Sequence, residues 1–137
     1  MRPDFTRVAI VNRGEPALRF TRAVRDYNRT HGAAIHTVAF YAHGDRRARF
    51  VRDADEGLDL TVFAGSESPR RSLYLDHGVL ERALLAAKAD AVWVGWGFVS
   101  EQASFAERCA RLGLTFLGFA FYPILGFGDS TYQPVTR

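Results

Sequence analysis

Cysteine is almost absent from this sequence, and the single residue of that type, Cys109, excludes several kinds of site. One cysteine cannot form a disulfide within the chain, and it cannot supply the thiolate cluster of a cysteine-based metal site. Cys109 falls on the apolar side of a predicted helix, together with Ala103 and Ala106. We therefore predict a small core residue there rather than a nucleophile.

Long apolar stretches are also missing from the chain. No run approaches the roughly 20 consecutive apolar residues of a membrane-spanning helix. Residues 1–4 lack the apolar segment with which a signal peptide would continue. We therefore expect a cytoplasmic protein that has no membrane partner.

A strong excess of one charge is lacking as well, because 18 Lys and Arg against 15 Asp and Glu give a formal net charge of +3. The arginines are dispersed, and the local groups at residues 46–49 and 70–71 have no aromatic residues between them. Interleaved aromatic residues would be typical of a nucleic-acid platform. We therefore interpret the arginines as a solvated face and expect no nucleic-acid partner.

The glycine pattern of dinucleotide-binding proteins is missing too. That pattern needs three glycines, whereas residues 12–17, after the first predicted strand, contain only Gly14. Glu15 would repel a diphosphate, and Asp45 after the second predicted strand is explained as a helix cap. No phosphate-cradling lysine loop is present, so a flavodoxin-like nucleotide binder is disfavoured. We predict no catalytic and no metal-binding residues, since no ligand spacing connects the four histidines, His31, His36, His43 and His77.

What the chain does contain is a regular alternation of strand-like and helix-like segments. Strands are predicted at residues 7–11, 34–41, 58–63, 91–94 and 115–118. The helical patterns begin at Pro16, before a predicted loop at residues 28–33, and recur at residues 46–52, 75–87 and 102–112. Strands separated by helices imply right-handed crossovers and a parallel sheet. We predict an α/β fold, a three-layer αβα sandwich with a central parallel, Rossmann-like sheet.

Residues 92–101, with the sequence VWVGWGFVSE, form the stretch most suggestive of a site. An apolar run ends at Gly95, Trp96 and Gly97, and a helical pattern follows from Ser100, so the turn lies at the carboxyl end of a predicted strand. Ligands bind at that edge of parallel sheets, and two glycines allow close approach to the backbone beside a flat ring. The alternative is that the glycines only make the turn and Trp96 covers the core.

Three separated stretches carry a resemblance to a known family. Residues 11–19 (VNRGEPALR), 50–56 (FVRDADE) and 95–101 (GWGFVSE) resemble the signature stretches of the biotin carboxylase amino-terminal domain, in the same order and with similar spacing. The resemblance covers about residues 5–118. It predicts one domain over residues 1–118 and a divergent, aromatic-rich tail over residues 119–137, where the ATP-grasp module of the family would begin.

The resemblance implies a part in a biotin-dependent acyl-CoA carboxylase. In the family, the whole component uses ATP, Mg²⁺ and bicarbonate to form carboxyphosphate and then carboxylates biotin on a carrier domain. It implies a biotin pocket at Trp96 and Gly97 and a homodimer face at Arg22 and Asp26, which the helical pattern alone explains as a weak exposed ion pair. The signature loop of the first βα turn corresponds to Asn12, Arg13, Gly14 and Glu15.

Departures from the family pattern occur around the third stretch and in the tail after residue 118. Trp93 and Val94 replace the usual His-Pro, Trp96 replaces a tyrosine, and Ser130 replaces the lysine at the entrance to the ATP-grasp module. The family's ATP-binding, metal-binding and catalytic residues belong to that module, so the chain alone is expected to bind no cofactor and to be inactive. The alternative is a stand-alone, non-catalytic interaction module with the same fold.

Overall fold

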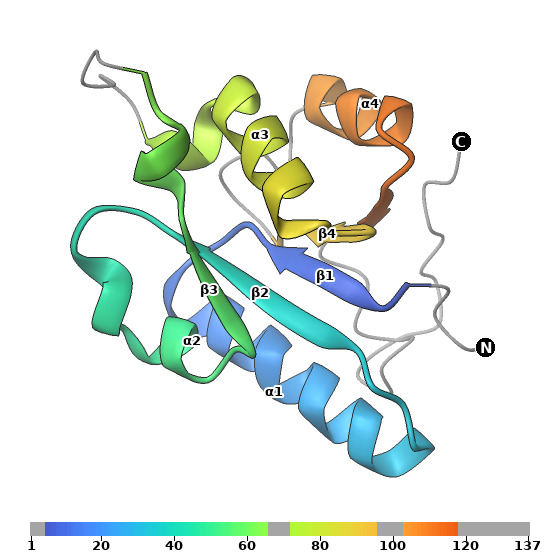
Figure 1. Ribbon diagram of the computed structural model, residues 1–137. Coiled ribbons are helices and arrows are strands. Elements are labelled where there is room, and N and C mark those ends of the chain that lie inside the picture. The colour runs from blue at the N-terminus through green and yellow to red at the C-terminus, as the bar shows by residue number, and fades with distance from the viewer. Residues whose placement is uncertain (1–4, 66–71, 96–102, 118–137) are drawn as a thin grey trace.

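The computed structural model describes residues 5–65, 72–95 and 103–117, which form one layered α/β unit (Figure 1). Its sheet contains five strands that all pair in parallel in the order β3-β2-β1-β4-β5. The strands are β1 (Arg7–Ile10), β2 (His36–Tyr41), β3 (Glu56–Asp59), β4 (Ala91–Trp93) and β5 (Thr115–Leu117). The predicted α/β class and parallel sheet are confirmed.

Helices cover both faces of this sheet, as a three-layer sandwich requires. Figure 1 shows α1 (Gly14–His31) and α2 (Arg49–Arg52) on one side, and α3 (His77–Ala87) and α4 (Ala103–Arg111) on the other. Three short 3-10 helices lie in the connections, η1 (His43–Arg47), η2 (Leu60–Phe63) and η3 (Leu73–Leu75). Within the part of the chain that the structure describes, no helix is long and apolar enough to cross a membrane.

The alternation of side chains along each strand divides the core into two clusters. Ile10 and Trp93 face α1, where they pack with Phe20, and their neighbours Ala9 and Val92 face the α3 and α4 layer. Cys109 belongs to the second cluster and is fully buried, which confirms the predicted core position. Burying both faces explains why the strands read as continuous apolar runs.

The amino edge of the sheet is fastened by two side chains. The Asp90 carboxylate accepts hydrogen bonds from the backbone N–H groups of Thr6, at 2.9 Å, and Arg7, at 2.8 Å. The Arg7 guanidinium in turn donates to the Ala87 carbonyl at the end of α3, at 2.8 Å. These bonds join the amino ends of β1 and β4 to the end of α3. They lie at the edge of the sheet opposite to the carboxyl ends of the strands.

The first helix is longer than its sequence pattern predicts. Residues 28–33 were expected to form a loop, but α1 continues to His31 and ends at Gly32, whose φ of 62° is left-handed. The Asn28 side chain explains the difference, because it bonds to both the N–H and the carbonyl of Ile35, each at 2.9 Å. A residue type common in loops here fastens a helix to the following segment.

Two predictions near β3 were wrong for local reasons. The helix predicted over residues 46–52 is divided into η1 and α2, and Ala48, not Asp45, precedes α2. The strand predicted over residues 58–63 ends at Asp59, whose carboxylate accepts from the N–H of Thr61 at 2.9 Å. That side-chain bond offers the backbone an alternative to the sheet and starts η2.

Candidate functional site at the carboxyl edge of the sheet

The carboxyl ends of β1 and β4 form the point where the order of the sheet reverses. From β1 the chain proceeds outward through β2 to β3, whereas β4 and β5 extend the sheet in the opposite direction. The connection from β1 leads to α1 on one face, and the one from β4 leads toward α4 on the other (Figure 1). Ligands of open parallel sheets bind in the crevice at such a reversal.

Asn12 joins the two connections at this point. The residue is 3% exposed, and its side-chain Nδ2 donates to the Val94 carbonyl at 2.9 Å. Its Oδ1 accepts from the backbone N–H of Arg13 at 2.8 Å. The buried amide therefore ties the start of the signature loop at residues 12–15 to the chain that leaves β4.

Arg13 joins the same loop to the segment after β2. Its Nε donates to Asp45 Oδ2 at 2.8 Å and its Nη2 donates to Asp45 Oδ1 at 3.0 Å, a bidentate arrangement. These hydrogen bonds and the negative charge of Asp45 raise the pKa of the Arg13 guanidinium. Because 55% of the Arg13 side chain is exposed, the pair fixes geometry more than it stabilises the fold.

This contact also corrects the role predicted for Asp45. The carboxylate was expected to cap a helix, but it accepts from Arg13 across the edge of the sheet. The contact could have been predicted from the position of Asp45 shortly after β2, because β2 is the neighbour of β1 and Arg13 follows β1. In a parallel sheet, the residues that follow neighbouring strands meet at one edge.

A hollow of about 340 Å³ lies beside the Arg13–Asp45 pair. Its lining mixes charged and apolar side chains from the signature loop, α1, η1 and α2: Arg13, Gly14, Glu15, Leu18, Asp45, Ala48, Arg49 and Phe50. Glu15 at this place is exposed and pairs with Arg19 at 3.3 Å. Three of the four predicted loop residues therefore line this hollow, while Asn12 is buried behind them.

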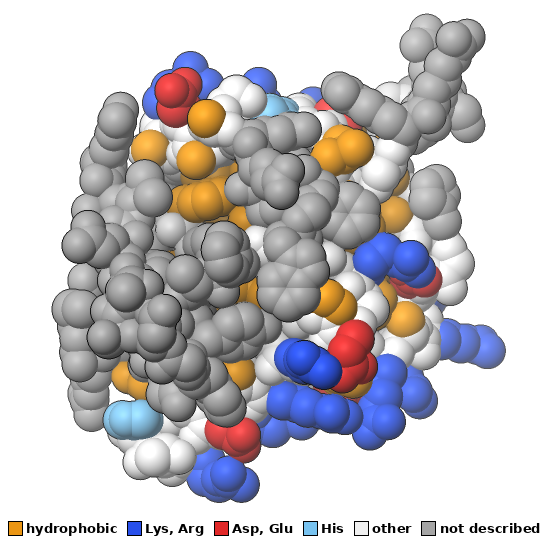
Figure 2. Space-filling model, turned by 180° about the vertical axis from the view of Figure 1, so that it is seen from behind, with side chains coloured by type: hydrophobic (Ala, Val, Ile, Leu, Met, Phe, Trp, Pro, Cys, Tyr) orange, Lys and Arg blue, Asp and Glu red, His pale blue; other side chains and the backbone are white. Residues whose placement is uncertain are grey.

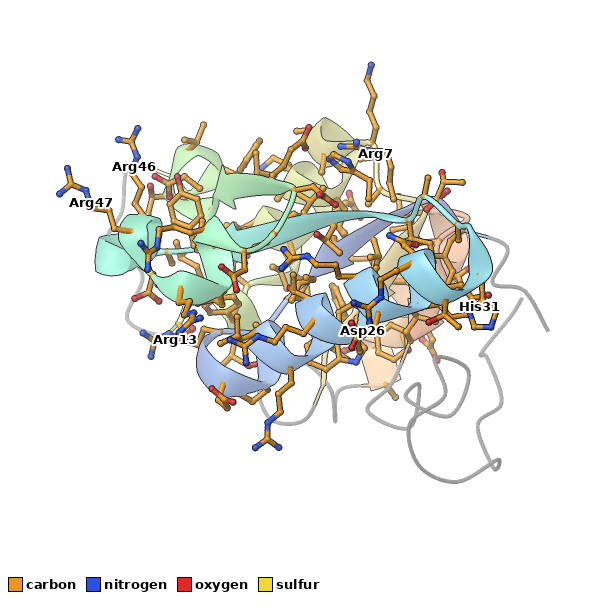
Figure 3. The ribbon with its side chains drawn as sticks, turned by 90° about the horizontal axis from the view of Figure 1, so that it is seen from below. Arg7, Arg13, Asp26, His31, Arg46 and Arg47 are labelled. Atoms are coloured by element: carbon orange, nitrogen blue, oxygen red, sulfur yellow. The ribbon has the colours of Figure 1, made fainter. Side chains whose placement is uncertain are left out.

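The predicted pair Arg22 and Asp26 lies elsewhere, on the exposed side of α1. Figure 3, in which α1 faces the viewer, places Asp26 on this outward side, and Asp26 bonds to Arg29 at 3.0 Å instead of to Arg22. Figure 2 shows Lys and Arg side chains gathered with a few acidic ones over the lower part of the molecule, where α1 and α2 lie. Arg22 and Asp26 are therefore not among the residues that line the hollow beside Arg13 and Asp45.

Trp96 and Gly97 lie outside the described residues, and Gly95 directly precedes them. Gly95 has a left-handed φ of 61°. A Cβ there would come within 2.8 Å of Asn12 Nδ2 and 2.9 Å of the Trp93 ring, so only glycine fits. Trp93 itself is fully buried and stacks on Phe20 with 4.3 Å between ring centres. Sequence reasoning assigned Gly95 to the turn and missed this packing.

One further titratable side chain, Tyr74, lies near this edge. The buried Tyr74 hydroxyl donates to the Phe40 carbonyl at 2.8 Å, and burial, with the charge of Asp45, raises the pKa of Tyr74. Within residues 5–65, 72–95 and 103–117, no three His, Cys, Asp or Glu side chains are grouped so that they could hold a metal ion. The described part of this edge therefore consists of the backbone at Val94 and Gly95, the Arg13–Asp45 ion pair and the hollow beside that pair.

Cys109 is expected to be inert toward thiol reagents in the folded chain. Burial raises the pKa of its thiol to about 12 from a usual value of 9.0, so at pH 8 the thiolate fraction falls roughly a thousandfold. Measuring labelling by a chromogenic disulfide at pH 8, with and without guanidinium chloride, checks this. We expect one equivalent to react only after unfolding, and rapid native labelling would contradict the buried position.

Comparisons with known proteins show which family this chain resembles. The sequence matches the family described as "Biotin carboxylase, N-terminal domain" over residues 4–121. It is 38% identical over 125 residues to the mitochondrial methylcrotonoyl-CoA carboxylase subunit alpha of Oryza sativa subsp. japonica, covering 91% of this chain and 16% of that protein. It is 39% identical over 112 residues to the biotin carboxylase of Haemophilus influenzae, covering 82% and 22%.

A solved structure shows the same similarity in three dimensions. The biotin carboxylase domain of a single-chain bacterial carboxylase has a TM-score of 0.64 and 39% sequence identity to this chain. That match covers 81% of this chain and 23% of the solved one. The chain spans only 16% of the length of the rice subunit and 22% of the length of the Haemophilus influenzae protein.

Proposed function

This chain belongs to the family of biotin carboxylase N-terminal domains, and from that premise we propose that it serves as this domain in an acyl-CoA carboxylase. There it would work with an ATP-grasp module that uses ATP, Mg²⁺ and bicarbonate, and with a biotin carrier domain. The observation that carries the proposal is the meeting of two signature stretches, at Asn12 and at Gly95, on the carboxyl edge of one sheet.

Within that assembly, we assign the biotin pocket to Trp96 and Gly97. Bound biotin would supply the ureido nitrogen that accepts the carboxyl group. Gly95 supports this assignment, because its left-handed backbone directly precedes these residues and lies close to Asn12 and Trp93. An indole following a glycine can pack flat against a fused ring system while the backbone stays close to it. The chain alone would carry no step of the reaction.

Reconstitution tests this proposal. The chain is mixed with a Haemophilus influenzae biotin carboxylase that lacks the matching N-terminal region, and carboxylation of free biotin is measured. We expect no bicarbonate-dependent ATP turnover from the chain alone, carboxylation from the mixture, and weaker carboxylation with Trp96→Ala. The exposed Val62→Ala variant is the matched control and should behave as wild type. Turnover by the isolated chain, or a stable mixture without carboxylation, would refute the proposal.

We also propose that the exposed side of α1 forms a homodimer contact through Arg22 and Asp26. Their opposite charges suit a two-fold interface, in which Arg22 of each copy pairs with Asp26 of the other copy. Light scattering of the reconstituted mixture should show dissociation on Arg22→Glu. Restoration of the dimer by adding Asp26→Arg in the same chain would identify the pair, whereas a dimer unaffected by Arg22→Glu would exclude it.

The cytoplasm is the proposed compartment. A single buried cysteine suits a reducing environment, although the similar protein from rice is a mitochondrial subunit. Imaging a fluorescent fusion in the source cell, or fractionating the cell, decides between the two compartments.

A further inference from the structure

We propose that Asn12 is a positioning residue for Val94 and Gly95, setting the direction in which the chain leaves β4. This inference rests on the proposed function, because it concerns how the biotin-binding turn is held. Asn12 would act through the Val94 carbonyl and the Gly95 backbone.

The first argument is where the pairing of β1 with β4 ends. Backbone bonding continues up to the N–H of Val11, which donates to the Trp93 carbonyl at 2.9 Å. The next strand-like donor, the N–H of Arg13, is taken by Asn12 Oδ1 instead. Beyond Val11 the Asn12 side chain takes over, since its Nδ2 holds the Val94 carbonyl at 2.9 Å. A buried carbonyl at a strand end needs such a donor.

The second argument is that the Asn12 amide has one permitted orientation. Its Nδ2 donates to a carbonyl and its Oδ1 accepts from an N–H, so a flipped amide would set oxygen against oxygen at Val94. The residue is 3% exposed, and water has little access to replace either bond. The amide is therefore a fixed point against which the chain leaving β4 is aligned.

The third argument is the closeness of Gly95 to this fixed point. The position of a Gly95 Cβ lies 2.8 Å from Asn12 Nδ2, and the Trp93 ring closes the other side at 2.9 Å. The left-handed backbone of Gly95 therefore lies between the Asn12 amide and the Trp93 indole, which stacks on Phe20. Trp96 follows Gly95 in the sequence, so the backbone direction at Gly95 sets the course of the chain toward the proposed biotin-binding residues.

Two variants separate positioning from general stability. Asn12→Asp keeps the shape and the acceptor for Arg13 but loses the donor to Val94, and Asn12→Leu loses both groups. Thr21→Val is the matched control, because Thr21 is 2% exposed and its hydroxyl donates within α1, to the Ala17 carbonyl at 3.0 Å. The control loses one buried side-chain hydrogen bond away from the edge of the sheet.

Hydrogen exchange of the chain itself is the first measurement. In Asn12→Asp and Asn12→Leu, we expect peptides covering residues 94–101 to exchange about tenfold faster, while peptides from β2 and α3 keep wild-type rates. Thr21→Val should leave residues 94–101 unchanged. Unchanged exchange at residues 94–101 in both Asn12 variants would overturn the proposal. The proposal would also be overturned if exchange became faster throughout the chain, or if both Asn12 variants failed to fold.

Kinetics of the reconstituted mixture are the second measurement. We expect both Asn12 variants to raise the KM for free biotin about tenfold or more, with bicarbonate-dependent ATP turnover in the absence of biotin unchanged. A fall in both activities by the same factor would overturn the proposal. If the wild-type chain does not reconstitute carboxylation, the proposed function fails, while the exchange measurement still decides whether Asn12 holds this turn.

Discussion

Replacing Trp93 by alanine is expected to lower the free energy of unfolding by about 4 kcal/mol, within the range for truncating a buried aromatic residue. Trp93 is fully buried on β4, stacks on Phe20 at 4.3 Å, and closes one side of the Gly95 backbone. Its removal leaves a cavity between the sheet and α1, because the rigid layers cannot collapse to fill it.

Urea unfolding followed by circular dichroism measures this loss without depending on the removed fluorophore. Val62→Ala is the control on a residue that is 74% exposed, and it should change the stability by no more than about 0.5 kcal/mol. Trp93→Phe retains an aromatic ring and should lie between the two. A loss below about 1 kcal/mol for Trp93→Ala would mean that the Phe20 stack is not part of a tightly packed core.

The layered fold followed from the sequence because its signal is local. Apolar runs at β1, β2 and β4 are buried on both faces, and the pattern of α1 exposes one side, so composition and periodicity were enough. The resemblance to biotin carboxylase domains, found on three short stretches, is confirmed by the family match over residues 4–121.

The contacts of the site could not be predicted because they join residues far apart in the chain. Asp45 has a local explanation as a helix cap, and only the adjacency of β1 and β2 brings it to Arg13. Asn12 reads as a turn residue, yet its amide bonds to Val94, 82 positions later. Periodicity carries no information about such pairs, whereas the order of the strands determines them.

The same contacts bring described parts of the three signature stretches close together. Asn12 bonds to Val94, which directly precedes the third stretch, and Arg13 bonds to Asp45, which precedes the second. Phe50, the first residue of the second stretch, lines the hollow beside Arg13 with Leu18. A change in one stretch is therefore expected to disturb the geometry of the others, even though each looks like an independent turn in the sequence.

Replacing Gly95 by alanine is expected to cost about 3 kcal/mol, the sum of left-handed backbone strain and overpacking. The strain arises because φ is 61°, and the overpacking because a Cβ would lie 2.8 Å from Asn12 Nδ2 and 2.9 Å from the Trp93 ring. Neither neighbour can move freely, since one is bonded to Val94 and the other is stacked on Phe20.

Gly32→Ala separates these two contributions. Gly32 has nearly the same φ, 62°, but nothing lies within 4 Å of its Cβ position, so alanine there should cost only about 1 kcal/mol of backbone strain. Urea unfolding of both variants should therefore differ by about 2 kcal/mol, the overpacking that Asn12 and Trp93 impose. Gly95→Ala should also speed hydrogen exchange at residues 94–101, as the Asn12 variants do. Equal losses at the two glycines would show that the chain leaving β4 can shift away from Asn12, and that this edge does not hold the turn before Trp96 in place.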